Sequence, residues 1–343
     1  MKNKALLALG VFLGLVLPAR GQDVGYVSLN QTIPLRHVQG GFNHMSVDSG
    51  HKLLFATAPT NKTLEIVDLK SGKSLRSLDG EAPAAVRFAP EFNQLYATRG
   101  ESVYIYDGKT FDLVTKVDLQ CRLDELQYDP ASKQLFVGCM TPDKTTIKIV
   151  SIPDGKPLGA IKLPAKPEGF VLEMKGKRIF ANMPSLNKVA VIDREKQTLT
   201  ATWSVKEAGG NYPIALDEFR HRLFVGCREP ARVVVFDTTT GNALASVAIS
   251  GDTDDLFYDA VVQLVYVSCG EGFLDIVMQG NGDVYKFNAR LDTAAGARTS
   301  AYSSELSSVF VGVPRRGNEP AEIRVFLIDD VVTRLHSEQW HAF

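Results

Sequence analysis

The chain has almost no net charge and few cysteines. Its 343 residues include 38 Lys and Arg against 39 Asp and Glu, which leaves a formal net charge of -1. A general nucleic-acid binder needs a basic face, so this balance argues against nucleic acid as a partner. Four cysteines are too few for a small disulfide scaffold. A single bridge is still compatible with an oxidising compartment.

Long apolar runs are also scarce, apart from one near the N-terminus. The run Ala5–Leu17 follows two lysines and precedes the small residues Ala19 and Gly21. This pattern predicts a signal peptide over residues 1–21, cut before Gln22. The alternative is a buried N-terminal helix. The run is too short to span a bilayer, and no later segment has the length and apolarity of a membrane helix. We therefore expect a periplasmic or secreted protein without a membrane span, and a monomer.

Helical periodicity is absent, and a short apolar run recurs instead. No stretch keeps a 3.6-residue period, so helix should be scarce. Runs such as "LFVG" start at residues 53, 95, 135, 179, 223, 265 and 309, separated by 40 to 44 residues. A nearly constant period in this range is typical of repeat architectures.

Each period contains the same four pieces. An apolar alternation such as "LQYD" comes first, the "LFVG" run second, a β-branched run such as "VVVFD" third, and a more polar strand follows a turn such as "TTTGN". Four antiparallel strands per period, repeated around an axis, make a β-propeller. We therefore predict an all-β fold, a seven-bladed β-propeller over residues 22–330, with a C-terminal tail over 331–343.

The last and first periods predict how the ring closes. The seventh period ends at Glu322–Ile328 and lacks a fourth strand, whereas Tyr26–Leu35 is a spare strand before the first period. We expect Tyr26–Leu35 to pair with the third strand of the last blade. Such a seam resists opening because parting it would leave a row of backbone donors and acceptors without partners.

The repeats also resemble a known family. The stretches "LFATAPTNKTLEIVDLKSGK" (54–73) and "LFVGCREPARVVVFDTTTGN" (223–242) resemble the YVTN-type β-propeller repeat, typified by YncE-like periplasmic proteins. The resemblance covers nearly all of the chain after the apolar N-terminal run. It implies a seven-bladed fold and export. It implies no particular activity, because a fold does not determine a function.

The positions just before each first strand are the candidate site. In a propeller these positions meet at one end of the central channel, and here they differ between repeats. The residues that we expect to bind a ligand there are His44, Asp124, Glu125, Glu168, Tyr212, Asp254, Asp255 and Arg298. Carboxylates suit Ca²⁺ or Mg²⁺, and a histidine beside them suits a transition metal or an acid–base pair. The alternative is a set of solvated loop residues that cap strand starts.

Three functions remain open at this point. The first is a binding or interaction module with a ligand or metal at the channel mouth. The second is a metal-assisted hydrolase or lyase, such as a lactonase, with His44 or a carboxylate as the base. The third is a scaffold that docks a partner protein. The ligand or partner, whether small molecule, metal or protein, is unknown.

Three of the four cysteines occupy equivalent positions in their repeats. Cys139, Cys227 and Cys269 each lie four residues after the start of their "LFVG"-type run, which suggests small structural residues. Cys227 and Cys269 belong to adjacent blades about 10 Å apart, too far for an unstrained bridge. Cys121 enters its blade at the end where Cys139 leaves the second strand, and this is the one pair placed to form a disulfide.

Overall fold

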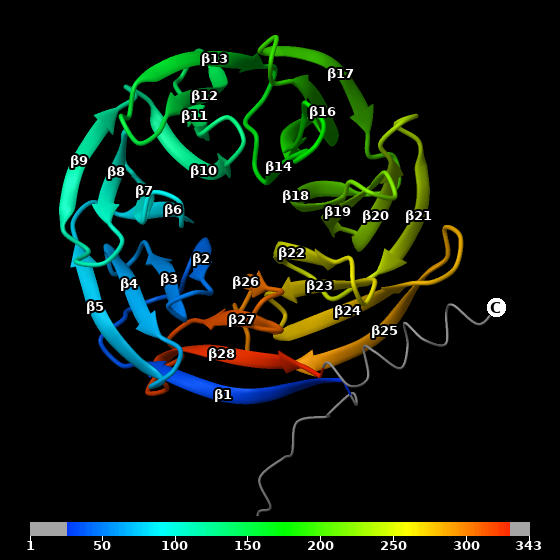
Figure 1. Cartoon of the computed structure of the whole chain (residues 1–343). Coiled ribbons are helices and arrows are strands. Elements are labelled where there is room, and N and C mark those ends of the chain that lie inside the picture. The colour runs from blue at the N-terminus through cyan, green and yellow to red at the C-terminus, as the bar shows by residue number, and fades with distance from the viewer. Residues whose placement is uncertain (1–25, 330–343) are drawn as a thin grey trace, which may run out of the picture.

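A computed structural model describes residues 26–329 of the chain. Over this range 28 strands form seven four-stranded sheets, which are arranged as blades in a ring (Figure 1). The predicted seven-bladed β-propeller is therefore confirmed. The predicted signal peptide (1–21), the first residues of the predicted domain and the tail (331–343) lie outside the described range. Within it, no helix has the length and apolarity needed to cross a membrane.

Each of the first six blades runs from an inner strand to an outer strand, in chain order. Blade 1 consists of β2 (Met45–Asp48), β3 (Leu53–Ala58), β4 (Thr63–Asp68) and β5 (Lys73–Asp79). Blade 2 consists of β6 (Pro83–Ala89), β7 (Gln94–Arg99), β8 (Ser102–Asp107) and β9 (Leu113–Asp118). Blade 3 consists of β10 (Arg122–Asp129), β11 (Gln134–Met140), β12 (Thr145–Ser151) and β13 (Pro157–Leu163).

Blades 4 to 6 follow the same order. Blade 4 consists of β14 (Phe170–Leu172), β15 (Arg178–Met183), β16 (Lys188–Asp193) and β17 (Thr198–Ser204). Blade 5 consists of β18 (Gly209–Asp217), β19 (Arg222–Glu229), β20 (Ala231–Asp237) and β21 (Ala243–Ala248). Blade 6 consists of β22 (Thr253–Asp259), β23 (Leu264–Cys269), β24 (Phe273–Gln279) and β25 (Tyr285–Asp292).

The seventh blade combines the two ends of the described chain. Its strands are β26 (Thr299–Ser303), β27 (Ser308–Val313), β28 (Ala321–Ile328) and, on the outside, β1 (Val27–Leu35). β1 pairs antiparallel with β28, from Val27 opposite Ile328 to Leu35 opposite Ala321. This is the strand pairing expected from the sequence, and it fits closure of the ring by an early strand.

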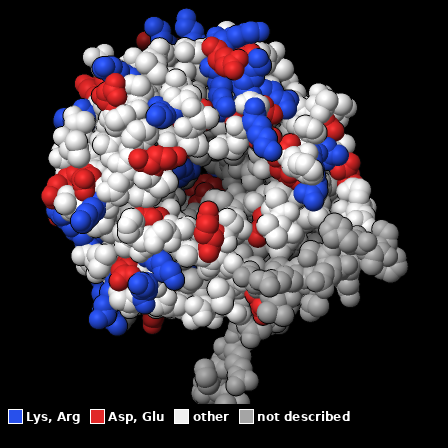
Figure 2. All heavy atoms as spheres, in the orientation of Figure 1, with Lys and Arg blue, Asp and Glu red and all other residues white. Residues whose placement is uncertain are grey.

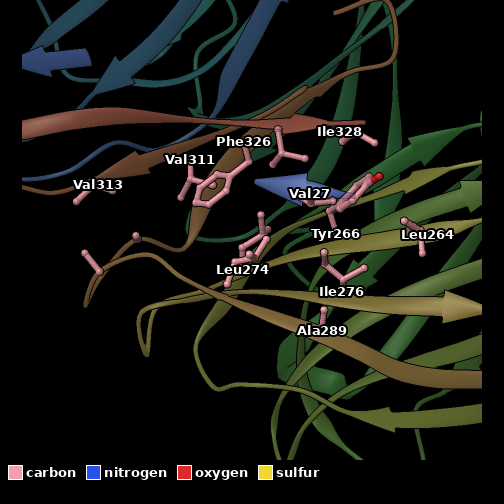
Figure 3. Packing of buried hydrophobic residues seen from close by; sticks show 14 residues of the cluster. Val27, Leu264, Tyr266, Leu274, Ile276, Ala289, Val311, Val313, Phe326 and Ile328 are labelled. Atoms are coloured by element: carbon pink, nitrogen blue, oxygen red, sulfur yellow. The ribbon is translucent and has the colours of Figure 1, made fainter. Parts of the chain in front are cut away.

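The core lies between the blades. Strands β3, β23 and β27 are buried at every position, because the second strand of a blade is covered by a neighbouring blade on each face. Outer strands such as β9 are exposed at almost every position. Figure 3 shows the packing between blades 6 and 7, where Tyr266, Ile276 and Phe326 belong to one buried cluster that also contains Val27 of β1. Each fully buried apolar side chain of this size contributes about 1.5–3 kcal/mol.

The Asp that closes many third strands fixes the following turn. Asp107 accepts hydrogen bonds from the backbone N–H groups of Lys109 (2.8 Å) and Thr110 (2.7 Å). Asp237 binds Thr239 and Thr240 in the same way. A short acidic side chain that bonds its own backbone two and three residues on stabilises a tight turn. The recurring Asp of the sequence repeat therefore has a structural role.

The structure decides the state of each cysteine, which the sequence left open. Cys121 and Cys139 form a disulfide with a Cα–Cα distance of 5.7 Å. Cys227 and Cys269 are free and buried. Burial raises the pKa of Cys227 to about 12, so this thiol stays protonated and is a poor nucleophile. Cys227, in the hairpin formed by β19 and β20, is therefore a structural residue.

Candidate functional site

A cavity of about 890 Å³ occupies the channel at the centre of the ring. All eight residues predicted from the sequence line this cavity, and they come from blades 1, 3, 4, 5, 6 and 7. Figure 2 shows the hollow at the centre of the ring, with acidic and basic side chains at and inside its opening. The structure thus brings together residues that are up to 254 positions apart (His44 to Arg298).

Irregularities in the inner strands help to present these side chains. The pairing of β10 with β11 shifts register between Leu123 and Leu126, around Asp124 and Glu125. The pairing of β22 with β23 shifts between Thr253 and Asp255. A β-bulge of this kind re-aims side chains that a regular strand would send alternately to opposite faces. Consecutive acidic residues can therefore both line the mouth.

His44 lies between two carboxylates from other blades. Its Nε2 atom is 3.2 Å from Glu125 Oε2, and its Nδ1 atom is 3.9 Å from Asp255 Oδ1. Glu125 Oε1 accepts a hydrogen bond of 3.2 Å from Arg87 Nη2. Asp255 Oδ2 accepts one of 2.7 Å from the backbone N–H of Ser300. These contacts join blades 1, 2, 3, 6 and 7 through one buried charged cluster.

The charges in this cluster shift one another's protonation. Burial by itself lowers the pKa of His44, but the carboxylates of Glu125, Asp255 and Asp124 outweigh burial, so the pKa of His44 is raised above its usual value. For Asp255, in contrast, burial raises the pKa to about 7, although His44 opposes this shift. The two shifts thus have different main causes, nearby carboxylates for His44 and burial for Asp255.

A second cluster joins blades 5, 6 and 7. Arg228 Nη2 lies 2.6 Å from Asp254 Oδ1, and the guanidinium covers the Tyr212 ring at 3.7 Å from its centre. Arg298 contacts Asp252 at 3.1 Å and Asp254 at 3.4 Å. Burial nevertheless raises the pKa of Asp254, because the two arginines offset the loss of water only in part.

A third cluster joins blade 3 to the start of blade 4. Lys166 Nζ lies 2.5 Å from Asp124 Oδ2 and 2.8 Å from Glu168 Oε1. Burial lowers the pKa of Lys166, but the two carboxylates outweigh it and the net pKa is raised. Burial raises the pKa of Glu168, with Lys166 acting against the shift.

Four residues of these clusters were not among the predicted ones. Arg87, Lys166 and Arg228 supply most of the partners for the predicted acids, and Asp252 pairs with the predicted Arg298. Arg87 could have been found from the sequence. It lies two residues after Ala85, which is the residue of blade 2 equivalent to the candidate-site positions of the other blades, and side chains two apart in a strand share a face. Arg228 had no such signal, because it ends a second strand and reaches the mouth only through the fold.

These residues are not solvated loop residues. The Glu125 side chain is 6% exposed, Asp255 15% and His44 18%. A carboxylate buried to this degree requires charged or hydrogen-bonding partners. These three side chains are therefore not exposed strand caps, whereas the side chain of Arg298 is 46% exposed.

The pairing of acidic with basic side chains at the mouth does not fit a divalent metal. Over residues 26–329, no three His, Cys, Asp or Glu side chains are grouped in a way that would hold a metal ion. Most acidic side chains at the mouth lie beside a basic one, as with Asp124 at Lys166 and Asp254 at Arg228. Ca²⁺ requires six to eight converging oxygen ligands, and oxygens already bound to basic side chains do not supply them.

Comparison with known proteins supports the fold. No family model and no curated protein matches this chain. A chain in the structure titled "Kuenenia stuttgartiensis Hydrazine Synthase" matches with a TM-score of 0.72 and 15% identity, over 83% of this chain and 95% of that one. A chain in "Crystal Structure of Mitotic Checkpoint Complex" matches with a TM-score of 0.74 and 14% identity, over 96% and 100%.

At these identities the likeness concerns the fold alone. It places the protein among seven-bladed β-propellers, a class whose rigid ring is consistent with an interaction module. The YVTN-type family remains a prediction from the repeats.

Proposed function

We propose that this protein is an exported, YVTN-type β-propeller that binds a small polar ligand at the mouth of its central channel. The observation that carries the proposal is the convergence of eight residues from six blades on one cavity of about 890 Å³. This volume lies within the range of small-molecule sites. The buried ion pairs hold the lining side chains in place before a ligand arrives, which lowers the entropic cost of binding.

The disulfide supports export. Cys121 and Cys139 are bridged, and such bonds persist in oxidising compartments such as the periplasm. The apolar run and small residues near the N-terminus point the same way. Detection of the mature protein in the periplasmic or secreted fraction, with an N-terminus at Gln22, would test this part of the proposal.

A thermal-shift screen tests the binding site. The panel would contain amines, amino acids, neutral sugars, mono- and dicarboxylates, and Ca²⁺ and Mg²⁺. A ligand that binds the folded state raises the melting temperature with concentration. The double variant Asp254→Asn and Asp255→Asn should reduce the shift caused by any hit. The exposed Asp112→Asn, whose carboxylate pairs with Arg76 at the rim, should not. If no compound stabilises the protein, the proposal is wrong.

Acid–base catalysis in the same cavity is a second candidate. The observation that favours it is His44, held 3.2 Å from Glu125 and facing Asp255, whose pKa of about 7 matches the working range of a general acid or base. A hydrolase or lyase would lose turnover of lactones or related esters in His44→Ala while it keeps its fold. A binding module would show no turnover in either form.

Docking of a partner protein is the third candidate. One of the matching folds belongs to a protein complex, the mitotic checkpoint complex. If the protein is a scaffold of this kind, the His44→Ala variant and the Asp254→Asn, Asp255→Asn double variant should still bind the partner protein. It would depend instead on exposed strands or loops, so a pull-down that compares these variants with the unmodified protein separates it from a mouth site.

A further inference from the structure

The basic side chains at the mouth are all engaged by the protein itself. Arg87 donates to Glu125 and to the backbone oxygen of Met45. Arg228 donates to Asp254 and to the backbone oxygen of Thr253. Lys166 bridges two carboxylates, and Arg298 contacts two more. An anionic ligand would have to break one of these pairs to find a donor.

Carboxylates and basic side chains at the mouth are equal in number. Five carboxylates line this end of the cavity, against four Lys and Arg side chains and His44. Asp252, just outside the lining, shares the two arginines of the second cluster. The five carboxylates are thus matched in number by five basic groups, and the acids differ in how closely each one is paired.

Asp255 is the carboxylate with the weakest compensation. Its Oδ2 atom accepts the Ser300 N–H at 2.7 Å. Its Oδ1 atom lies 3.9 Å from His44 Nδ1, which is beyond hydrogen-bond distance. The other acids at the mouth each have a basic atom within 3.2 Å, as Asp254 has in Arg228. Asp255 therefore has an acceptor oxygen available to a ligand.

The cavity also has an apolar part near Asp255. Phe257 follows it by two residues on β22, so the two side chains share a face of the strand, and both line the cavity. Ala301 of the adjacent β26 lines the same part. A ligand whose charged group reaches Asp255 can therefore place an apolar body against Phe257. A bare metal ion would leave this surface uncovered.

We propose that the cavity binds a small organic ammonium compound, with the ammonium group at Asp255 and the apolar body against Phe257. This inference rests on the proposed binding function and specifies its ligand class. The ammonium group donates to Asp255 Oδ1, and its charge compensates the one carboxylate at the mouth that has no basic atom within hydrogen-bond distance. Phe257 covers the body of the ligand through apolar contact.

Three probes that share a phenylethyl body test the charge selection: 2-phenylethylamine, 2-phenylethanol and 3-phenylpropionate. Isothermal titration of the full protein at pH 7.5 should show that the amine binds at least tenfold more tightly than the alcohol. The carboxylate should bind more weakly still. Equal binding of the alcohol, or tighter binding of the carboxylate, would overturn the inference and leave the mouth site itself intact.

Three variants test the place of binding. Asp255→Asn keeps the size of the side chain and its acceptor for Ser300, and should weaken amine binding at least tenfold with little effect on the alcohol. Phe257→Leu should weaken both probes. Asp112→Asn, on the exposed rim, should leave the affinities unchanged. Circular dichroism would confirm that each variant is folded.

Two results contradict the proposal directly. Amine binding that is unchanged in Asp255→Asn would place the cation elsewhere. Absence of amine binding at millimolar concentration would exclude the ammonium class. The proposed function fails only if no compound of the mixed panel stabilises the protein, so the two failures are distinguishable.

Discussion

The imidazole of His44 in blade 1 lies 3.2 Å from the carboxylate of Glu125 in blade 3. The contact crosses part of the channel mouth, because blade 2 lies between blades 1 and 3 in the ring. It lies in the same cavity as the carboxylate of Asp255 in blade 6. Charges from opposite sides of the ring are therefore compensated in one place, which makes the mouth sensitive to the loss of any one of them.

Neutralisation of Glu125 should lower the pKa of His44. Of the three carboxylates that raise this pKa, Glu125 makes the largest contribution. Glu125→Gln removes that contribution, while burial continues to lower the pKa. An NMR titration that follows the His44 ring signals would measure the change. The exposed Asp112→Asn, which lies outside this cluster, should leave the His44 signals unchanged.

Asp255→Asn should stabilise the protein at pH 8 more than at pH 4. A carboxyl group with a folded-state pKa of about 7 and an ordinary value of 3.8 binds its proton more tightly in the folded state. Its contribution to stability is therefore lost as the pH rises from about 4 to 7.

The isosteric amide avoids this loss, so the variant should gain up to about 4 kcal/mol at pH 8, at roughly 1.36 kcal/mol per pKa unit. Urea denaturation at both pH values measures the difference. A variant that is less stable than the unmodified protein at pH 8 would show that the carboxylate is compensated after all.

Loss of the disulfide should destabilise blade 3. The bridge between Cys121 and Cys139 closes a loop with a sequence separation of 18, and a loop of this length corresponds to about 3 kcal/mol in the chain-entropy account. The double variant Cys121→Ser and Cys139→Ser should unfold at lower denaturant concentration.

Thiol counting on unfolded, unreduced protein provides the independent check. It should find the two free thiols of Cys227 and Cys269. Four thiols would show that the bridge does not form.

Truncation of a buried β1 side chain should weaken the seam of blade 7. Ile33 is fully buried and packs with Phe310 and Ile323, so Ile33→Ala should cost about 2–5 kcal/mol. Leu29, on the same strand, is 47% exposed, and Leu29→Ala should cost much less. Chemical denaturation of the two variants makes the comparison, and equal effects would mean that β1 does not hold the blade together through its buried face.

Much of the fold could be predicted from local patterns. The run at Leu223, its equivalents every 40 to 44 residues and the Asp that ends strands such as β20 are all visible in consecutive residues. The pairing of β1 with β28 was also predictable, because one period lacked a strand and another segment was spare. Cys121 and Cys139 were predictable as a pair because both lie at one end of the same blade.

The candidate site was predictable only in part. Equivalent positions in the repeats identified Asp124, Asp255 and the other ring residues, since repeat symmetry places them at one end of the channel. Partners such as Arg228 and Lys166 do not occupy that position in the repeat. Their long side chains reach the mouth from a second strand and from a connection between blades. Repeat periodicity carries no information about such reach.

The amino-acid sequence by itself determined the number of blades, the order of the strands and the ring of residues at the channel mouth, because each follows from a pattern repeated along the chain. Only the tertiary structure decided which acid meets which base, and that Asp255 is left with the weakest partner. The physical reason is that ion pairs form between side chains from different blades, and their distances depend on how the blades pack and not on spacing in the sequence.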